Sequence, residues 1–234
     1  MKYLLLLAII FSSAACRYNS RKGSGKIISE KRTTENFVAI NADGPVHVEI
    51  QKGATVSVTV ETDDNIMPFV ETKVSGSTLK IRLKEINRLR NSKIRVFITA
   101  PELKELNSSA SAEIESKDII TTSGNMEMQA SSGSKIDVAL EAPSVTAETS
   151  SGADIIARGR TKNFTATAGS GSSVKAGDLL AENATGEAGS GASVKMFGSL
   201  SINANAGSGG KVTYTGGATQ VKKNESSGGS VREY

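Results

Sequence analysis

The sequence predicts an all-β protein whose main part is a parallel β-helix-like solenoid with coils of about 19 residues. A Ser-Gly pair recurs six times, with steps of 19, 19, 20, 18 and 19 residues between successive serines. The repeat serines are Ser132, Ser151, Ser170, Ser190, Ser208 and Ser227. An aliphatic residue follows each serine after four positions, and apolar and polar residues alternate along the strands. A fixed period without helical patterning is typical of stacked coils.

Residues 1–15 have the features of a signal peptide for export. Lys2 precedes an apolar run of nine residues, which is too short to span a bilayer, and small residues follow this run. Cys16, the single cysteine of the chain, stands directly after two alanines, as does the acylated cysteine of bacterial lipoproteins. We therefore expect lipidation at Cys16, with two acyl chains that give stable anchoring. Ordinary cleavage that leaves a free cysteine is the alternative.

Residues 30–234 are expected to form one β-helical domain behind a lipidated, flexible tether at residues 16–29. The tether is polar and basic, so it either lies against anionic lipid head groups or is solvated. Within the domain, residues 30–107 are rich in charge and in larger apolar residues, and turn signals such as Asp43-Gly44-Pro45 separate their short strands. We interpret them as the first coils, elaborated by hairpins that cap the N-terminal end. Residues 108–234 contain the Ser-Gly repeats.

Each repeat is interpreted as a turn, a short strand, a bend and a second short strand. The residues expected to point inward are small or medium-sized: Ile136, Val138, Leu140, Phe164, Ala166, Ala168, Ile202, Ala204 and Ala206. The repeat serines are expected to form one column, with hydroxyls that bond to one another and to the corner backbone. The C-terminal end shows no capping element, and charges at Lys222, Lys223, Arg232 and Glu233 protect its edge. A meandering antiparallel sheet is the alternative fold.

The composition excludes several functional classes. One histidine and one cysteine leave no basis for a His-rich or Cys-rich metal centre, and no cofactor is expected. A Gly-x-Asp motif of calcium-binding repeats occurs once in the repeats, at residues 152–154, instead of in every coil. The formal net charge of +4 is too small for a nucleic-acid-binding protein of this length.

Acidic residues of the repeats are the candidates for an enzyme. Asp137, Asp154 and Asp178 follow their repeat serines by 5, 3 and 8 positions, so they do not share one column. Glycoside hydrolysis needs two carboxyl groups at a defined separation, which this spacing does not provide. A polysaccharide-degrading β-helix enzyme is therefore the weakest of the functional hypotheses, and we expect no catalytic residues.

Arg88, Arg90, Lys93 and Arg95 are the candidate binding residues, because they gather within eight positions and could form a patch for an anionic ligand. A solvated edge or loop is the alternative interpretation. His47 alternates with Val46 and Val48, so we expect it to point outward into solvent rather than to act as a ligand.

Four passages occur in a specific order: NFVAINADGPVHVEIQKG at 36–53, STLKIRL at 77–83, KIRVFITAPELKEL at 93–106, and the Ser-Gly repeats. In this order they resemble the putative auto-transporter adhesin, head GIN domain family of Gram-negative envelope lipoproteins. The resemblance implies a right-handed parallel β-helix-like fold and an exported protein, usually lipid-anchored, with no catalytic residues.

We therefore expect a lipoprotein of the cell envelope, anchored in the outer membrane, that binds a partner through a long Ser/Thr-rich surface. The partner would be an extracellular glycan or an envelope protein. A structural or signalling-associated envelope component with a protein partner is the alternative.

Overall fold

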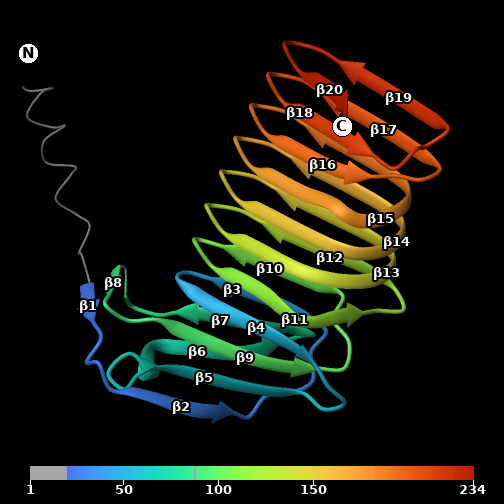
Figure 1. Cartoon of the computed structure of the whole chain (residues 1–234). Coiled ribbons are helices and arrows are strands. Elements are labelled where there is room, and N and C mark those ends of the chain that lie inside the picture. The colour runs from blue at the N-terminus through green and yellow to red at the C-terminus, as the bar shows by residue number, and fades with distance from the viewer. Residues whose placement is uncertain (1–19, 87) are drawn as a thin grey trace, which may run out of the picture.

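The computed structural model describes residues 20–86 and 88–234, which form a parallel β-solenoid (Figure 1). Most coils contribute one strand to each of two walls, and strands of neighbouring coils pair in parallel. Wall A contains β7 (Thr78–Leu83), β3 (Ala39–Asp43), β10 (Glu105–Ser109), β12 (Asn125–Ala130), the second halves of β13 (Lys135–Thr149), β14 (Asp154–Ala168) and β15 (Ser173–Ala188), β17 (Ser201–Ala206) and β19 (Gln220–Glu225). Wall B contains β9 (Ile94–Ala100), β4 (Val46–Lys52), β11 (Glu113–Thr121), the first halves of β13, β14 and β15, β16 (Ser193–Phe197), β18 (Lys211–Thr215) and β20 (Ser230–Glu233). The predicted parallel solenoid is confirmed.

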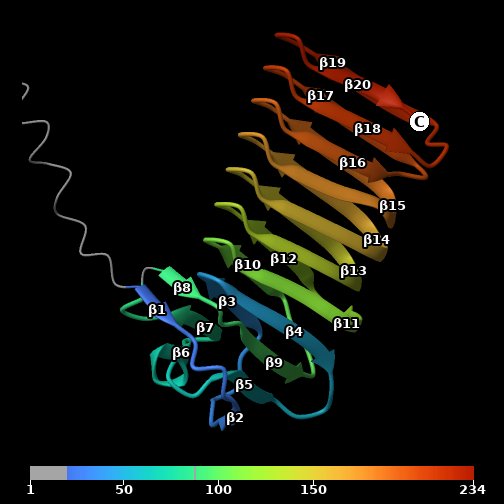
Figure 2. The ribbon, with the colours of Figure 1, turned by 60° about the vertical axis from the view of Figure 1, so that its left-hand side comes forward.

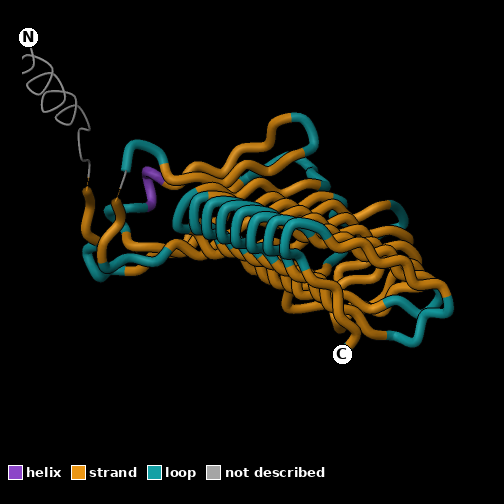
Figure 3. The backbone as a smooth tube through the Cα atoms, turned by 90° about the horizontal axis from the view of Figure 1, so that it is seen from above, coloured by secondary structure: helices purple, strands orange, loops and turns teal. Residues whose placement is uncertain are grey.

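A tight turn built by the Ser-Gly pair leads from wall A of one coil to wall B of the next. Both residues have positive φ, as in Ser151 (53°) and Gly152 (72°). Successive turns stack because the glycine N–H of one turn donates to the serine carbonyl of the next, for example from Gly152 to Ser170 at 3.2 Å (Figure 3). The predicted serine column is therefore present. Its ladder runs through backbone hydrogen bonds, and the six serine side chains are exposed.

The opposite corner has no tight turn, since β13, β14 and β15 each run continuously from wall B into wall A. Gly159 precedes this bend in β14 with a φ of 119°. A Cβ atom at this position would lie 2.0 Å from the carbonyl oxygen of Leu140 in the neighbouring coil. Glycine is required here because the two backbones approach more closely than any side chain allows.

Small and medium-sized side chains from the two walls fill the interior. The nine residues predicted to point inward between Ile136 and Ala206 are all buried, and Phe164 is the largest of them. The aliphatic residue four positions after each repeat serine is also buried. These are Ile136, Ile155, Val174, Val194, Val212 and Val231. The period-two alternation therefore predicted the correct face of the strands that contain these residues.

The N-terminal coils are stacked in a different order from their order in the sequence. In wall A, β3 lies between β7 and β10, and in wall B, β4 lies between β9 and β11. The coil at residues 39–52 is thus inserted between those at residues 78–100 and 105–121.

Antiparallel strands close this N-terminal end, opposite β19 and β20 (Figure 2). They are β2 (Ile27–Arg32), β5 (Ser57–Asp63) and β6 (Val70–Ser75), with the 3₁₀ turn η2 (Met67–Phe69) between β5 and β6. The sequence predicted the hairpin elaboration but not the insertion.

The last coil has charged residues in its inward column. Lys223 and Glu225 occupy the positions that Ala204 and Ala206 hold in the coil before. Lys223 places its ammonium group 4.9 Å from the centre of the Tyr214 ring, and Glu225 accepts a hydrogen bond from the backbone N–H of Val231 at 2.5 Å. The C-terminal end is therefore finished by polar side chains of the last coil itself.

Residues 20–29 form part of the folded domain, whereas we expected residues 16–29 to be a flexible tether. The strand β1 (Ser20–Lys22) pairs in parallel with β8 (Arg88–Arg90), and β2 pairs with β5. Between them, the N–H of Gly25 donates to a carboxylate oxygen of Asp63 at 2.6 Å. The predicted signal peptide and Cys16 lie outside the described residues. Within the part of the chain that the structure describes, we find no helix of sufficient length and apolarity for a membrane crossing.

Candidate functional site

The outer side of wall A is a continuous polar surface, which we call the polar face. It consists of the outward residues of β12, β13, β14, β15 and β17, and twelve of these fifteen residues are Asn, Gln, Ser or Thr, while three are Glu. They are Asn125, Glu127, Gln129, Ser144, Thr146, Glu148, Asn163, Thr165, Thr167, Asn183, Thr185, Glu187, Ser201, Asn203 and Asn205. The surface is thus rich in neutral donors and acceptors of hydrogen bonds.

The polar face is regular because parallel pairing places equivalent residues in columns. Thr146, Thr165 and Thr185 are direct neighbours in successive coils. Coils repeat about every 4.8 Å, and outward residues of one strand repeat about every 6.6 Å. Side-chain bonds fix part of this array: Asn183 donates to Asn163 at 3.1 Å and accepts from the Ser201 hydroxyl at 2.8 Å. The result is a pre-positioned grid of polar groups.

The outer side of wall B carries a cluster of charged residues that we call the His47 cluster. It contains His47 and Glu49 from β4, Arg95 from β9, Glu61 from β5, and Glu113, Glu115 and Lys117 from β11. Register brings these residues together, since His47 is the direct partner of both Glu113 and Arg95. Two additional residues in β11, relative to β13, produce a bulge between Glu115 and Ile119.

Three carboxylates surround the imidazole of His47. Its Nδ1 lies 3.2 Å from Glu113, and its Nε2 lies 3.3 Å from Glu115 and 3.7 Å from Glu49. The Glu49 residue is only 7% exposed, although its side chain points outward. The prediction that His47 points outward is correct, but the side chain is only 30% exposed and lies among carboxylates rather than in open solvent.

Two cations balance part of this negative charge. Arg95 donates to Glu49 Oε1 through two nitrogen atoms, at 2.6 and 3.1 Å, and these bonds raise the pKa of the guanidinium. Lys117 bonds to Glu115 and lies 3.5 Å from Glu49. The hydrogen bond from Lys117 is the main reason that the pKa of Glu115 is below its ordinary value. The ionised form of Glu115 is therefore favoured by its place in the cluster.

The four predicted basic residues have different surroundings. Arg88 and Arg90 belong to β8, which is paired with β1, whose residues Arg21 and Lys22 add further positive charge. Lys93 is exposed and lines an open hollow beside His47. Arg95 is engaged with Glu49 and lies 3.6 Å from Glu61. The positive charge at the N-terminal end is thus centred on β1 and β8, and Arg95 belongs to the His47 cluster.

The three aspartates considered for catalysis lie in separate columns of wall B. Asp137 forms ion pairs with Arg158 at 2.8 Å and Lys135 at 3.1 Å. Burial acts to raise the pKa of Asp137, but these two hydrogen-bonding cations outweigh it and lower the pKa. Asp154 lies 3.3 Å from Lys175, and Asp178 is in register with Arg158. None of these arrangements presents a pair of free carboxyl groups to a substrate.

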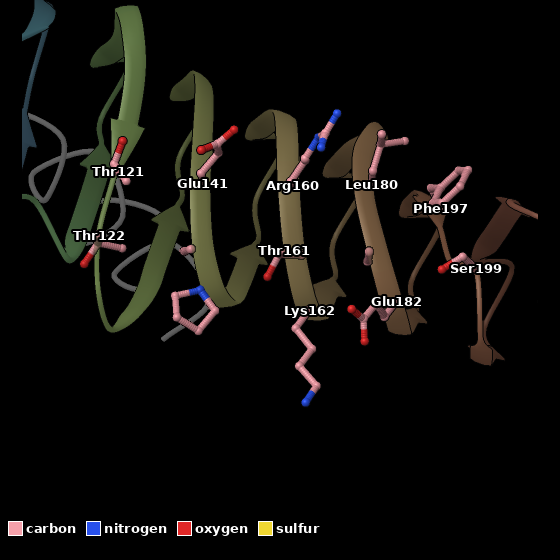
Figure 4. Close-up of a pocket in the computed structure, with 13 residues that line it drawn as sticks. Thr121, Thr122, Glu141, Arg160, Thr161, Lys162, Leu180, Glu182, Phe197 and Ser199 are labelled. Atoms are coloured by element: carbon pink, nitrogen blue, oxygen red, sulfur yellow. The ribbon is translucent and has the colours of Figure 1, made fainter.

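A second surface that sequence reasoning missed lies at the continuous corner (Figure 4). An open hollow of about 770 Å³ runs along the bends of β13, β14 and β15. Glu141, Arg160 and Leu180 form one column in successive strands, and Leu180 is 45% exposed. Each of these three residues follows an inward-facing position at the bend, and the sequence shows that spacing. The three side chains are acidic, basic and apolar, so no common chemistry identified them as a surface.

Comparison with solved structures supports the fold. A putative adhesin from Bacteroides fragilis superimposes with a TM-score of 0.84 at 17% sequence identity, covering 92% of this chain and 100% of the other. A putative lipid binding protein from Parabacteroides distasonis gives 0.73 at 20% identity, with coverages of 92% and 100%. A putative adhesin from Parabacteroides merdae gives 0.70 at 18% identity, with coverages of 92% and 99%. A comparison with curated proteins gives no match.

The family comparison agrees with the four passages that the sequence analysis identified. The matched segment extends from residue 36 to residue 218, so it includes the inserted N-terminal coil and all but the last Ser-Gly turn. Because this segment is most of the chain, the protein belongs to the family described as putative auto-transporter adhesin, head GIN domain.

Proposed function

We propose that the protein is an envelope-anchored, non-catalytic, adhesin-like binding protein that uses the polar face to bind a hydroxyl-rich partner such as an extracellular glycan. The observation that carries this proposal is the regular grid of Asn, Thr, Ser and Gln side chains on wall A. Family membership supports a binding role at the cell envelope or surface.

The chemistry of the polar face suits a ligand with many hydroxyl groups. Amide and hydroxyl side chains both donate and accept, so each can exchange a water for a sugar hydroxyl at little cost. The backbone ladder and the side-chain bonds around Asn183 hold these groups in place before binding. Similar polar positions recur in the five coils of the polar face, so several weak contacts to a repetitive polymer act together.

The anchor in this proposal is a diacylated Cys16, followed by a short link to β1 at Ser20. The basic residues of β1 and β8 lie next to this link and would face anionic lipid head groups. Replacing Cys16 with Ala is expected to move the protein from the membrane fraction to the soluble fraction. Retention of the variant in the membrane fraction would contradict the anchor.

A structural or signalling-associated envelope component with a protein partner is the second candidate. The corner hollow favours it, because exposed Leu180 lies there among charged groups of both signs, including Glu141 and Arg160. Apolar groups surrounded by polar ones are typical of protein interfaces. A polysaccharide-degrading enzyme receives no support from the ion-paired Asp137 and Asp154.

The test is binding of the full-length protein, in detergent, to panels of glycans and matrix proteins at several salt concentrations. Thr165→Lys and Thr185→Lys place bulky charges in the centre of the polar face and are expected to weaken glycan binding at least tenfold. Thr213→Lys is the matched control, because Thr213 points outward from wall B. Saturable glycan binding that the polar-face variants leave unchanged would contradict the proposal, and binding of protein partners alone would favour the second candidate.

A further inference from the structure

We propose that the His47 cluster is a binding site for a divalent transition-metal ion, with zinc as the reference ion, ligated by His47 Nε2, Glu49 and Glu115. Ligand atoms of these three residues lie within 4.8 Å of one another. The site is on wall B, so the inference is independent of the proposed binding function of wall A.

The two distances from His47 Nε2 to the ligand carboxylates fit a tetrahedral ion. Zinc bonds of about 2.0–2.1 Å to nitrogen and oxygen separate ligand atoms by about 3.4 Å. The separations here are 3.3 Å from His47 Nε2 to Glu115 and 3.7 Å from Nε2 to Glu49. Three protein ligands leave a fourth position for water, as in open zinc sites.

The orientation of the imidazole supports the assignment. An ionised carboxylate only accepts hydrogen bonds, so the contact of 3.2 Å between Nδ1 and Glu113 requires that Nδ1 carry the proton. Nε2 lies 3.3 Å from Glu115 and 3.7 Å from Glu49, so a metal ion would bind there in place of any proton on this nitrogen, while Nδ1 keeps its own proton toward Glu113. A carboxylate that fixes the tautomer of a ligating histidine is the usual second partner in zinc sites.

The ligand carboxylates are supported in the same way. Arg95 holds Glu49 through two hydrogen bonds, and Lys117 holds Glu115. Glu49, the most buried member, belongs to β4, which pairs with strands on both sides. The ligands therefore stand on paired strands rather than on loops, which reduces the reorganisation needed for binding.

The charge of the cluster leaves room for a divalent ion. Apart from His47, whose ring is uncharged when it ligates a metal ion, the ion-paired groups comprise four carboxylates (Glu49, Glu61, Glu113 and Glu115) and two cations (Arg95 and Lys117), which gives a net charge of −2. In the next two coils, Lys135 and Arg158 are engaged with Asp137. A divalent ion would thus bring the cluster to neutrality.

Lys117 identifies the position where positive charge is favoured. Its ammonium group contacts both Glu49 and Glu115, the two carboxylates of the proposed site. The side chain is 46% exposed and extends from the bulge of β11, so it can move into solvent when a metal ion binds. Lys117 therefore competes with the metal, and Lys117→Met is expected to strengthen zinc binding several-fold.

The experiment is a titration of the full-length, tag-free protein with Zn²⁺, monitored by calorimetry and by NMR of the imidazole nitrogens. The chain has one histidine, so a single imidazole reports on the site without any substitution. We expect one Zn²⁺ per chain, a shift of the Nε2 resonance, and retention of the proton on Nδ1. With Co²⁺, we expect the intense visible absorption of a four-coordinate ion.

Three variants and a control complete the test. His47→Gln and Glu115→Gln are expected to weaken zinc binding at least tenfold, and Glu113→Gln by about 10- to 100-fold through loss of the tautomer-fixing contact. Glu182→Gln, at the distant corner, should bind zinc like the native protein. An imidazole resonance that does not move at saturating Zn²⁺, or equal affinity in a folded His47→Gln variant, would overturn the proposal.

Discussion

At the scale of single residues, glycine has two distinct roles in this solenoid. At the Ser-Gly turns it provides a positive φ in open space, since no atom lies within 4 Å of a Cβ added to Gly152. At the continuous corner, Gly159 provides a positive φ and also allows close contact with the backbone of Leu140. The conformation alone is moderately costly for another residue, whereas the close contact cannot be relieved without moving a strand.

This difference predicts unequal effects of two identical substitutions. Gly152→Ala should lower the free energy of unfolding by about 1 kcal/mol, the cost of a left-handed conformation for alanine. Gly159→Ala adds an overlap with the Leu140 carbonyl and should cost about 3 kcal/mol or more. Urea denaturation followed by circular dichroism measures both. Equal losses in the two variants would show that the close approach at Gly159 is relieved without cost.

At the scale of elements, local patterns predicted the repeat coils, whereas distant pairings were not accessible from the sequence. The coils of β13, β14 and β15 are neighbours in both sequence and space, so the period and the alternation determined their register. The insertion of β3 and β4 between later strands leaves no mark in the chain, because parallel pairing requires no specific turn between the paired strands.

The same reasoning explains how far the surroundings of the candidate site residues could be predicted. The outward direction of His47 followed from alternation, but its partner Glu113 lies 66 residues away along the chain. The grouping of Arg95 with Arg88 was based on proximity in sequence, while the fold places Arg95 against Glu49. Local spacing therefore predicts which face a residue occupies, and the order of the coils decides which residues it meets.

Ion pairs between neighbouring strands predict a pH dependence of stability. Arg158 in β14 and Lys135 lower the pKa of Asp137 in β13 below its ordinary value of 3.8, against the opposing effect of burial. A carboxyl group with a lowered pKa in the folded state stabilises fully above its unfolded pKa, and this contribution is lost as the pH falls through the folded value.

Asp137→Asn should therefore lower the free energy of unfolding at neutral pH by about 0.5–1 kcal/mol, a value typical of a solvent-screened ion pair. The difference between variant and native protein should vanish as the pH falls below the folded pKa of Asp137. Thermal unfolding at a series of pH values measures it, with Glu148→Gln as the control at an exposed carboxylate of wall A. A difference that persists unchanged at the lowest pH would mean that the charge of Asp137 is not its cause.

At the scale of the whole molecule, the two ends of the solenoid differ in how their strand edges are covered. The N-terminal end is closed by the antiparallel strands β2, β5 and β6. The C-terminal end has β19 and β20 as edge strands, and every residue of β19 is exposed. Charged residues in the inward column of an edge strand prevent another chain from continuing the stack. Lys223 and Glu225 occupy that column, so they protect the molecule from end-to-end growth.

Lys223→Val should convert the C-terminal end into an apolar template, because valine would extend the inward column of Ala166, Gly186 and Ala204. We expect this variant to form oligomers whose size increases with protein concentration, measured by size-exclusion chromatography with light scattering. Lys222→Val is the matched control, since Lys222 is adjacent in the same strand but continues the outward column of Asn203. If neither variant associated more than the native protein does, backbone edge geometry rather than inward charge would be what limits the solenoid. If both variants assembled equally, the loss of one positive charge would be enough to cause assembly. Assembly of Lys223→Val but not of Lys222→Val would show that the inward position provides the protection.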